Sequence, residues 1–268
     1  AEHLELTEEF GEQGAKMDAD VFTWWIENFD EFVDYCVRDT TLLRRCSEKL
    51  NAIPFFIAMQ KAHGVQFKST HNVTNYLRGQ FARRTPLKAP TLFNRQRDTL
   101  TAATVAETKP GRWEGVALLD FASMYPRIIL DANLCLTTKR RGSGDGIRSV
   151  GNGTHWDREQ TGILPAIVRD MMELRKEYKQ KMKEAETEDE AFQYDMLQLA
   201  VKVATNAMYG YVSQRRVGGG WIDPDVGATI TFYGRKCIEA LLTESEKEGY
   251  RALAGHTDSG YIQVPFDE

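Results

Sequence analysis

Cysteine is scarce in this 268-residue sequence, and long apolar runs are absent from it. The four cysteines form no CxxC pair and have no neighbouring histidine, which argues against a structural zinc site and a disulfide framework. We interpret them as ordinary buried thiols of a reduced intracellular protein. No apolar run approaches the roughly 18 residues of a membrane-spanning helix, and the acidic start lacks the basic and apolar regions of a signal peptide. Because the chain begins without methionine, we expect it to start partway through a longer protein.

The charge of the chain is unevenly distributed. The formal net charge of −5 and the pI of about 5.7 would ordinarily argue against a nucleic-acid partner. The first 50 residues hold 5 basic and 13 acidic residues, however, whereas residues 139–183 hold 11 basic and 6 acidic ones. The acidity therefore belongs to the start of the chain and excludes no nucleic-acid ligand for the rest. Hydrophobic residues at 42% and charged residues at 27% are typical of a globular protein.

The apolar pattern predicts an α+β fold with a mixed sheet flanked by helices rather than a doubly wound parallel sheet. Apolar residues recur at helical spacing over residues 20–63, 70–84, 163–186, 190–211 and 226–248. Residues 116–121 are predicted as a buried strand, 250–266 as two strands around a tight turn, and 101–107 as a short strand. Residues 139–162, rich in glycine, arginine and serine, are expected to form an exposed loop or hairpin.

Two aspartates occupy strand-associated positions far apart in the sequence. Asp120 lies in the strand at 116–121, and Asp258 lies in the turn between the last two strands. A strand end and a turn each project a carboxylate beyond a sheet, and two such carboxylates together suit Mg²⁺, which binds a few carboxylates and the phosphate oxygens of a substrate. Aspartates at such positions also cap turns, so the pattern alone leaves a structural role open.

The two long helices predicted after residue 162 each carry polar residues on one face. Arg175 and Lys179 are four positions apart, and Lys202, Asn206 and Tyr209 follow one another at helical spacing. If the helices form an antiparallel hairpin, these faces line one groove, and its cations suit a triphosphate. A solvated charged face is the alternative, because acidic residues lie among the cations of the first helix.

Five segments of the sequence resemble family B DNA polymerases. Residues 120–129, DFASMYPRII, resemble motif A (DxxSLYPSII), 202–210, KVATNAMYG, resemble motif B (KxxxNSxYG), and 254–262, AGHTDSGYI, resemble motif C (YGDTDSxxV). Residues 162–179 are similar to the family's fingers helix, which begins with GILP and carries an RxxxK pair. Residues 35–39, YCVRD, resemble the YxxxD of the third proofreading-exonuclease motif. Since the segments follow the family's order, the sequence is identified as a member of that family.

The resemblance implies template-directed DNA synthesis, in which a dNMP unit passes from a dNTP to a primer 3′-hydroxyl. Asp120 and Asp258 would ligate two Mg²⁺ ions, or Mn²⁺ in their place, with the backbone carbonyl of Phe121 as a further ligand. The remaining matches concern the nucleotide. Its triphosphate would be bound by Arg175, Lys179, Lys202 and Asn206 and by the backbone amides of Ser123 and Met124, Tyr125 would exclude a 2′-hydroxyl, and Tyr209 would pack near the nascent base pair.

The resemblance also implies a domain layout with a polymerase palm, a mostly antiparallel sheet backed by helices. Residues 1–50 would be the C-terminal part of a 3′–5′ exonuclease domain, 51–110 connecting helices and a loop, 111–160 the palm with motif A, 161–211 a helical-hairpin fingers insertion with motif B, and 212–268 the palm with motif C. Expected partners are primer–template DNA, a dNTP, replication accessory proteins and the remainder of the polymerase, with no membrane. The location would be the cytoplasm, at the nucleoid or replication site of a bacterium, phage or virus, or the nucleus of a eukaryote.

The sequence departs from the family at motif C and at its ends. His256 stands where the family has the first aspartate, and because neutral histidine is a poor Mg²⁺ ligand, we hypothesise that it weakens metal binding or changes the metal preference. Tyr35 and Asp39 match one exonuclease motif without upstream partners, so proofreading is not expected. The chain stops after motif C, before a thumb, so we expect little or no activity from it alone. A catalytically inactive DNA-binding homologue and a fragment that retains only an exonuclease segment are the alternatives.

Two basic segments outside the main motifs are ambiguous. Arg215 and Arg216 would contact template phosphates, and the KRR at 139–141 would strengthen non-specific binding of DNA. Arginines are common on protein surfaces, so an ordinary solvated surface is the alternative for both segments.

Overall fold

The computed structural model describes residues 21–70, 72–85, 108–142, 144–148, 153–213 and 221–265. Within these ranges the helices, in chain order, are α2 (Val21–Glu27), α3 (Phe29–Lys49), α4 (Ala52–His63), the 3₁₀ turn η2 (Phe67–Ser69), α5 (Val73–Arg84), α6 (Met124–Asp131), α7 (Ile163–Glu184), α8 (Glu188–Val212) and α9 (Pro224–Lys247). The strands are β1 (Val116–Asp120), β2 (Lys139–Arg141), β3 (Ile147–Arg148), β4 (Thr154–Trp156), β5 (Arg251–His256) and β6 (Ser259–Gln263). The expected α+β class is confirmed, and the strand expected at 101–107 lies outside the described residues.

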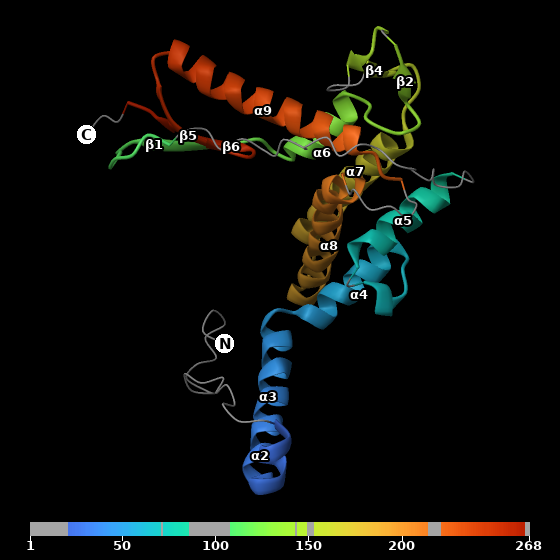
Figure 1. The fold of residues 1–268 in the computed structure, drawn as a ribbon, viewed down its shortest axis with the longest axis vertical. Helices are drawn as coiled ribbons and strands as arrows, with labels where there is room; N and C mark the ends of the chain where they lie inside the picture. Colours follow the sequence, from blue (N-terminus) through green and yellow to red (C-terminus); the bar gives the residue numbers. More distant parts are fainter. Residues whose placement is uncertain are drawn as a thin grey trace.

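A three-stranded antiparallel sheet in the order β1-β6-β5 brings the two predicted strand regions together. Helix α9 covers one face of this sheet and lies above it in Figure 1. The contact is close because Gly260 lacks a side chain: a Cβ at that position would lie 2.9 Å from Leu241 of α9. The opposite face carries the exposed side chains of Val116, Leu118 and Tyr261. The expectation of a buried strand at 116–121 is therefore wrong about its burial, because among the described helices only α9 covers the sheet and it covers the other face. This arrangement leaves one face of the sheet open at the end of β1.

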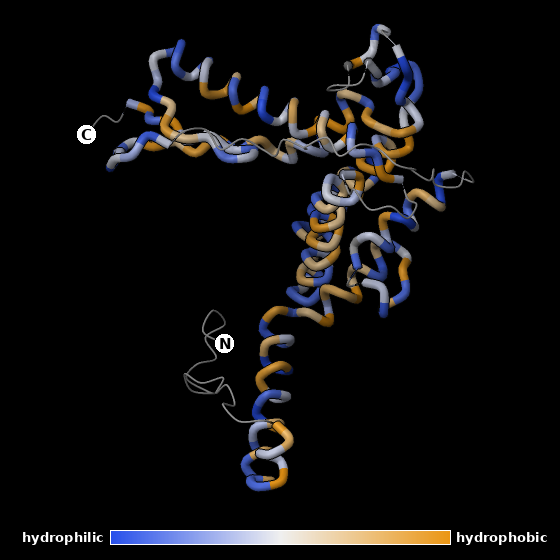
Figure 2. The backbone as a smooth tube through the Cα atoms, in the orientation of Figure 1, coloured by the Kyte–Doolittle hydropathy of each residue, from blue (hydrophilic) through white to orange (hydrophobic). Residues whose placement is uncertain are grey.

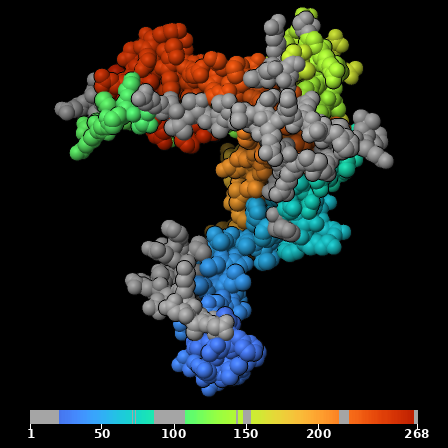
Figure 3. Space-filling model, viewed as in Figure 1, coloured from blue at the N-terminus to red at the C-terminus, as the bar shows by residue number. Residues whose placement is uncertain are grey.

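Helices α7 and α8 form an antiparallel hairpin that stands at an angle to the sheet and α9 (Figures 1 and 3). Helix α7 begins directly after Gly162 and has Pro165 in its first turn, where a missing N–H breaks no helical hydrogen bond. Helix α8 begins at Glu188, two residues before the expected start, because the Thr187 hydroxyl accepts a hydrogen bond from the Glu190 amide (3.2 Å). Acidic residues in this first turn complement the helix dipole.

The hydrophobic core runs from the hairpin into the helices beside it. Its centre consists of fully buried side chains from α4, α5, α7 and α8, among them Met59, Phe81, Ile167 and Met208. Helices α4 and α5 pack against α8, and an ion pair of Arg84 with Asp170 (2.5 Å) joins α5 to α7. The hairpin therefore packs against α4 and α5, and it also contacts α6 and α9.

A second antiparallel sheet, β2-β4-β3, occupies the segment expected as an exposed loop or hairpin. Its β2 strand contains the KRR sequence, and the three residues have different environments. The Lys139 ammonium lies in a nearly buried cluster with Asp223 (2.7 Å) and Asp225, above the Trp156 ring. Arg140 pairs with Asp157 (3.4 Å), and Arg141 is exposed. The expectation that residues 139–162 are exposed is therefore wrong for Lys139.

Helices α2 and α3 extend away from the rest of the molecule (Figure 1) and carry many exposed apolar residues, which are the orange turns in Figure 2. Among the largest exposed fractions are those of Phe22 at 72%, Ile26 at 66% and Leu43 at 71%.

The four cysteine thiols are free, and only Cys135 is fully buried, so the expectation of four buried thiols is wrong for the other three. Across the described ranges, no helix is both long and apolar enough to cross a membrane.

Candidate functional site

The two aspartates of motifs A and C lie at one corner of the sheet. Asp120 is the last residue of β1 and lies opposite Ser259, the first residue of β6. Ser259 directly follows Asp258 in the chain. The Phe121 amide donates a hydrogen bond to the carbonyl oxygen of Asp258 (2.8 Å). Antiparallel pairing of β1 with β6 thus brings together two acidic residues that are 138 positions apart.

Both carboxylates are accessible to a ligand. Asp120 is exposed and Asp258 is half-buried, and no described cation lies within ion-pair distance of either side chain. Across the ranges that the structure describes, no group of three His, Cys, Asp or Glu side chains is arranged to hold a metal ion. Two open carboxylates fit Mg²⁺ or Mn²⁺, since such hard cations bind one or two carboxylates and complete their coordination with water and substrate phosphate.

Two non-glycine residues beside these aspartates adopt left-handed backbone conformations. Thr257, in the turn between β5 and β6, has φ 50°, and Ser123, which precedes α6, has φ 58°. Such conformations are unfavourable for residues with a Cβ and cost about 1–3 kcal/mol each. Backbone strain thus lies on both sides of the aspartate corner, where the chain leaves β1 and where it turns into β6.

Tyr125 of motif A joins the aspartate corner to motif B. Its ring lies 4.8 Å from that of Tyr209, centroid to centroid, at an angle of 52°. A Cβ added at the buried Gly234 of α9 would lie 3.1 Å from the ring's Cε1 atom. Burial raises the pKa of Tyr125, the neighbouring Tyr209 and Asp258 raise it further, and Arg235 acts in the opposite direction. The ring therefore lies between α8 and α9 and within electrostatic reach of Asp258.

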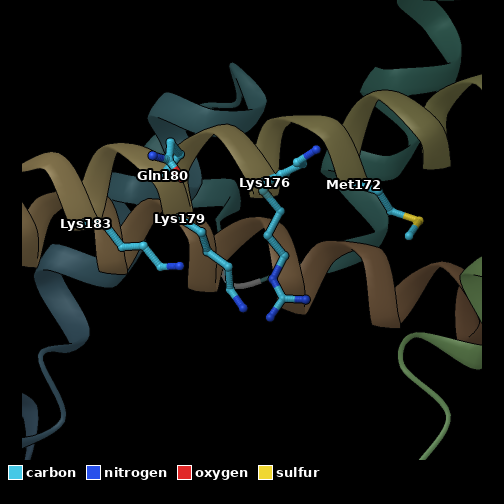
Figure 4. A pocket seen from close by; sticks show the side chains of 6 residues that line it. Met172, Lys176, Lys179, Gln180 and Lys183 are labelled. Atoms are coloured by element: carbon cyan, nitrogen blue, oxygen red, sulfur yellow. The ribbon is translucent and has the colours of Figure 1, made fainter.

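The basic face of α7 forms an open groove of about 340 Å³. Its lining consists of six residues of this helix, Met172, Arg175, Lys176, Lys179, Gln180 and Lys183. Figure 4 shows Lys179 and Lys183 projecting from α7 toward α8. The predicted pair of Arg175 and Lys179 thus shares one surface with two further lysines, and four cations along one helix face favour a polyanionic ligand.

The polar residues of α8 lie beside this groove but do not line it. Lys202 and Asn206 are exposed and Tyr209 is half-buried, on the helix face that the sequence predicts. A side-chain hydrogen bond joins the two helices one turn before Lys202, where Gln198 Oε1 accepts from Arg175 Nε (3.3 Å). The expected single groove lined from both helices is therefore formed by α7 alone in this conformation.

His256 lies on the same face of the sheet as Asp120. It is opposite Ser259 on β6, and Ser259 is in turn opposite Asp120 on β1, so the three residues form one row across the sheet. The imidazole is exposed, and its Nδ1 lies 3.2 Å from the Thr257 hydroxyl. The departure from the family pattern is thus located on the accessible face beside the two aspartates.

The exonuclease-like residues lie elsewhere. Tyr35 and Asp39 are on α3, remote from β1 in Figure 1, and a hydrogen bond to Asp39 together with its charge raises the pKa of the Tyr35 hydroxyl. The Tyr35 ring also contacts Trp24 edge-on at 5.9 Å. Arg215 and Arg216 lie outside the described residues. The structure therefore brings Asp120 next to Asp258 and Tyr125 next to Tyr209, and it leaves Tyr35 and Asp39 apart from them.

Sequence reasoning missed two residues of this site. Gln198 is four positions before Lys202 on the same helix face, and that spacing was the available signal. Gly234 precedes Arg235 in the middle of α9, where a glycine is costly unless something packs against it. The observed contact with Tyr125 supplies that reason.

Comparison with known proteins agrees with this arrangement. The family model of DNA polymerase family B matches residues 39–263. DNA polymerase 1 of Pyrococcus abyssi is 30% identical over 174 residues, which are 64% of this chain and 22% of the relative. The DNA polymerase delta catalytic subunit of Oryza sativa subsp. japonica is 30% identical over 256 residues, 85% of this chain and 23% of the relative.

A solved structure covers still more of the chain. The family B DNA polymerase of Pyrobaculum calidifontis matches 92% of it with a TM-score of 0.68 and 26% identity, and the match covers 34% of that polymerase. The chain thus spans between about a fifth and a third of the proteins that it matches. Motifs A and C meet at one corner of the sheet, Tyr125 of motif A contacts Tyr209 of motif B, and the family model covers most of the chain's length. The chain belongs to DNA polymerase family B.

Proposed function

We propose that this chain carries the nucleotidyl-transfer site of a DNA polymerase, which adds dNMP units from dNTPs to the 3′-hydroxyl of a primer on a template. The observation that supports this most is the meeting of Asp120 and Asp258 at an open corner of the sheet, joined by the hydrogen bond from Phe121 to Asp258. The basic groove on α7 and the Tyr125–Tyr209 pair provide separate surfaces for a triphosphate and a nucleoside.

The proposed metal site uses the carboxylates of Asp120 and Asp258 and the carbonyl of Phe121. Two divalent cations there, Mg²⁺ or Mn²⁺, would supply acidification of the primer hydroxyl and neutralisation of charge on the departing pyrophosphate. The site's own contribution is to hold the two carboxylates close together, because Asp120 ends β1 opposite Ser259 and the Phe121 amide donates a hydrogen bond to the carbonyl of Asp258 in the adjoining turn. The strained residues Ser123 and Thr257 fix where the chain turns away on either side.

The proposed nucleotide site extends from this corner along the hairpin. Arg175, Lys179, Lys202 and Asn206 bind the triphosphate, and the backbone amides of Ser123 and Met124 meet it from the palm. The Tyr125 ring excludes a ribose 2′-hydroxyl, and Tyr209 contacts the nascent base pair. The packing of Tyr125 between Tyr209 and Gly234 supports this role, because a ring that selects by shape has to be held in place.

The proposed domain layout assigns the sheets and α9 to the palm, over residues 111–160 and 212–268, and the α7–α8 hairpin to the fingers, over residues 161–211. Residues 51–110 connect these parts to residues 1–50, the end of an exonuclease domain that contributes Tyr35 and Asp39 without activity of its own. Primer–template DNA and a dNTP are the proposed ligands. Because the chain spans a minor part of its relatives, we expect weak binding of primer–template and slow, distributive synthesis.

His256 is proposed to weaken metal binding or to change the metal preference of the site without abolishing the chemistry. Its position in one row with Ser259 and Asp120 supports an influence on the bound cation. Primer extension by His256→Asp, compared with the parent at several Mg²⁺ concentrations, tests this idea. We expect a higher rate and a lower Mg²⁺ requirement in the variant, and identical Mg²⁺ curves would contradict it.

The proposed function is tested by extension of a labelled primer on a template, with the chain in excess and with Mg²⁺ or Mn²⁺. Asp120→Asn and Asp258→Asn are each expected to lower the rate of primer extension about 100-fold or more, since each removes a negative charge that would bind the divalent cations. Asp131→Asn is the matched control, because this exposed aspartate at the end of α6 lies outside motifs A, B and C. DNA binding without any metal-dependent extension by the parent would favour the catalytically inactive homologue instead.

A further inference from the structure

The Gln198 side chain joins the two helices of the hairpin at the level of the basic groove. Its Oε1 accepts a hydrogen bond from Arg175 Nε (3.3 Å), and its Nε2 donates one to Asp195 Oδ1 (2.9 Å). Gln198 and Asp195 belong to α8, one turn apart, whereas Arg175 belongs to α7. The three side chains therefore form a chain of hydrogen bonds from a carboxylate through an amide to a guanidinium.

The order of these groups determines which way the amide faces. A guanidinium can only donate hydrogen bonds, and an ionised carboxylate can only accept them. Gln198 satisfies both neighbours only if its NH₂ faces Asp195 and its oxygen faces Arg175. Asp195 thus fixes the amide orientation that presents an acceptor to the guanidinium.

This hydrogen bond restrains an arginine that the groove depends on. Arg175 is half-buried and lines the groove with Lys179. The bond engages only the Nε–H group, and no other described side chain or carbonyl accepts from Arg175. Its terminal nitrogens therefore remain available for the two parallel hydrogen bonds that a guanidinium forms with phosphate oxygens. A long side chain that is held before binding loses less freedom when a ligand arrives.

The same bond relates the two cationic faces to each other. Gln198 precedes Lys202 by one turn on α8, and Lys179 follows Arg175 by one turn on α7. The hydrogen bond between Arg175 and Gln198 thus lies one turn from Lys179 on α7 and one turn from Lys202 on α8. Without it, Arg175 is free to take other rotamers within the groove or outside it.

We propose that Gln198, oriented by Asp195, is a positioning residue that holds Arg175 for the triphosphate of an incoming nucleotide. The inference rests on the proposed function of the chain as a nucleotidyl transferase and adds the residues that prepare its triphosphate site. It assigns to Gln198 no contact with the substrate.

The test compares Gln198→Leu, which keeps the side-chain volume and removes both hydrogen bonds, with Gln193→Leu, an exposed position on the same helix. Calorimetry measures the binding of dATP and of inorganic tripolyphosphate in the presence of Mg²⁺. We expect both dissociation constants to rise about five- to tenfold in Gln198→Leu and to stay unchanged in Gln193→Leu, as for the loss of one hydrogen bond to a charged group. Equal loss for the two ligands points to the triphosphate rather than to the base.

A second readout is independent of nucleotide binding. It is the Arg175 Nε–H resonance in a ¹⁵N–¹H spectrum, assigned by its absence in Arg175→Lys. We expect this resonance in the parent and in Gln193→Leu. In Gln198→Leu we expect it to be lost through exchange with solvent. Unchanged affinity together with an unchanged resonance in Gln198→Leu would overturn the positioning role. Failure of the parent to bind dATP would instead overturn the proposed function, and loss of the resonance would then still support restraint of Arg175 by Gln198.

Discussion

At the scale of single residues, the candidate site depends on side chains whose environment is set by distant parts of the chain. Tyr125 illustrates this, because its ring contacts Tyr209 of α8 and Gly234 of α9 and lies near Asp258 of the β5–β6 turn. Its ionisation therefore reports on three segments at once.

The first prediction concerns the charge of Asp258. Burial is the largest cause of the raised pKa of Tyr125, and the negative charge of Asp258 adds to it. Asp258→Asn removes that charge and is expected to lower the pKa of Tyr125. A titration of the tyrosine ¹³Cζ chemical shifts measures the change, with Asp131→Asn as control. An unchanged Tyr125 titration in Asp258→Asn would show that the carboxylate and the ring are not neighbours.

The second prediction concerns the space beside the Tyr125 ring. Gly234→Ala places a Cβ 3.1 Å from Tyr125 Cε1 and 3.6 Å from Met124 Sδ, so we expect a loss of unfolding free energy of about 1–3 kcal/mol from overpacking. Gly79→Ala is the matched control in α5, because its Cβ meets only Arg83 Nη1 at 4.0 Å. It is expected to raise the unfolding free energy by about 0.5–1 kcal/mol. Urea denaturation measures both, and equal effects would contradict the packing argument.

The third prediction concerns His63, which is 2% exposed and stacked on Tyr76 at 4.5 Å. Burial lowers its pKa to about 4, a hydrogen bond to the backbone of Ala200 acts in the opposite direction, and the charge of Arg83 lowers it further. The unfolded chain therefore binds a proton near the ordinary histidine pKa of about 6.5, before the folded chain does. Stability is complete above that pH and falls as the pH drops toward 4, by up to about 3 kcal/mol.

Unfolding free energies measured between pH 7 and 4 test this dependence. His63→Phe keeps the stacking on Tyr76 and removes the titrating group, so its stability is expected to vary less with pH. His155→Phe, outside the core, serves as the control and is expected to retain the parent's dependence. Parallel curves for the parent and His63→Phe would exclude His63 as the source.

At the scale of elements, the cluster of Lys139, Asp223 and Asp225 connects the small sheet to the start of α9. Asp223 caps this helix by accepting from the Asp225 amide (3.0 Å), and its side chain is 1% exposed. Lys139→Ala removes the ammonium group that both nearly buried carboxylates contact, so we expect a loss of unfolding free energy of about 3–5 kcal/mol. Arg140→Ala, at an exposed ion pair, is expected to cost less than about 1 kcal/mol. Thermal or urea unfolding distinguishes the two, and similar losses would contradict the role of the cluster.

Sequence patterns predicted most of these elements because their signals are local. Helices α7, α8 and α9 follow apolar spacing, and β5 and β6 follow the alternation around the HTDS turn. The pairing of β1 with β6 and the environments of Lys139 and Gln198 depend on contacts between distant segments. Hydrophobic periodicity carries no information on such contacts. The motifs therefore identified Asp120 and Asp258, but not the residues that hold Arg175 and Tyr125 in place.

At the scale of the whole molecule, the β1-β6-β5 sheet and α9 meet the α7–α8 hairpin at an open angle (Figure 3). Helices α2 and α3 extend beyond this body with exposed apolar side chains such as Trp25 and Ile26. The relatives are three to five times longer than the part that they share with this chain. In the proposed function, the aspartate corner and the α7–α8 hairpin carry out the synthesis. Its rate depends on the affinity of the chain for primer–template DNA.

Asp120 and Asp258 are proposed to hold the divalent cations of nucleotidyl transfer together. An electron paramagnetic resonance titration with Mn²⁺ in the presence of dATP counts the ions bound by the chain and by the double variant Asp120→Asn, Asp258→Asn. We predict that the parent with dATP binds Mn²⁺ beyond the amount bound by dATP alone and that the double variant loses this binding. The same number of bound ions, at the same affinity, in the parent and the double variant would contradict the claim.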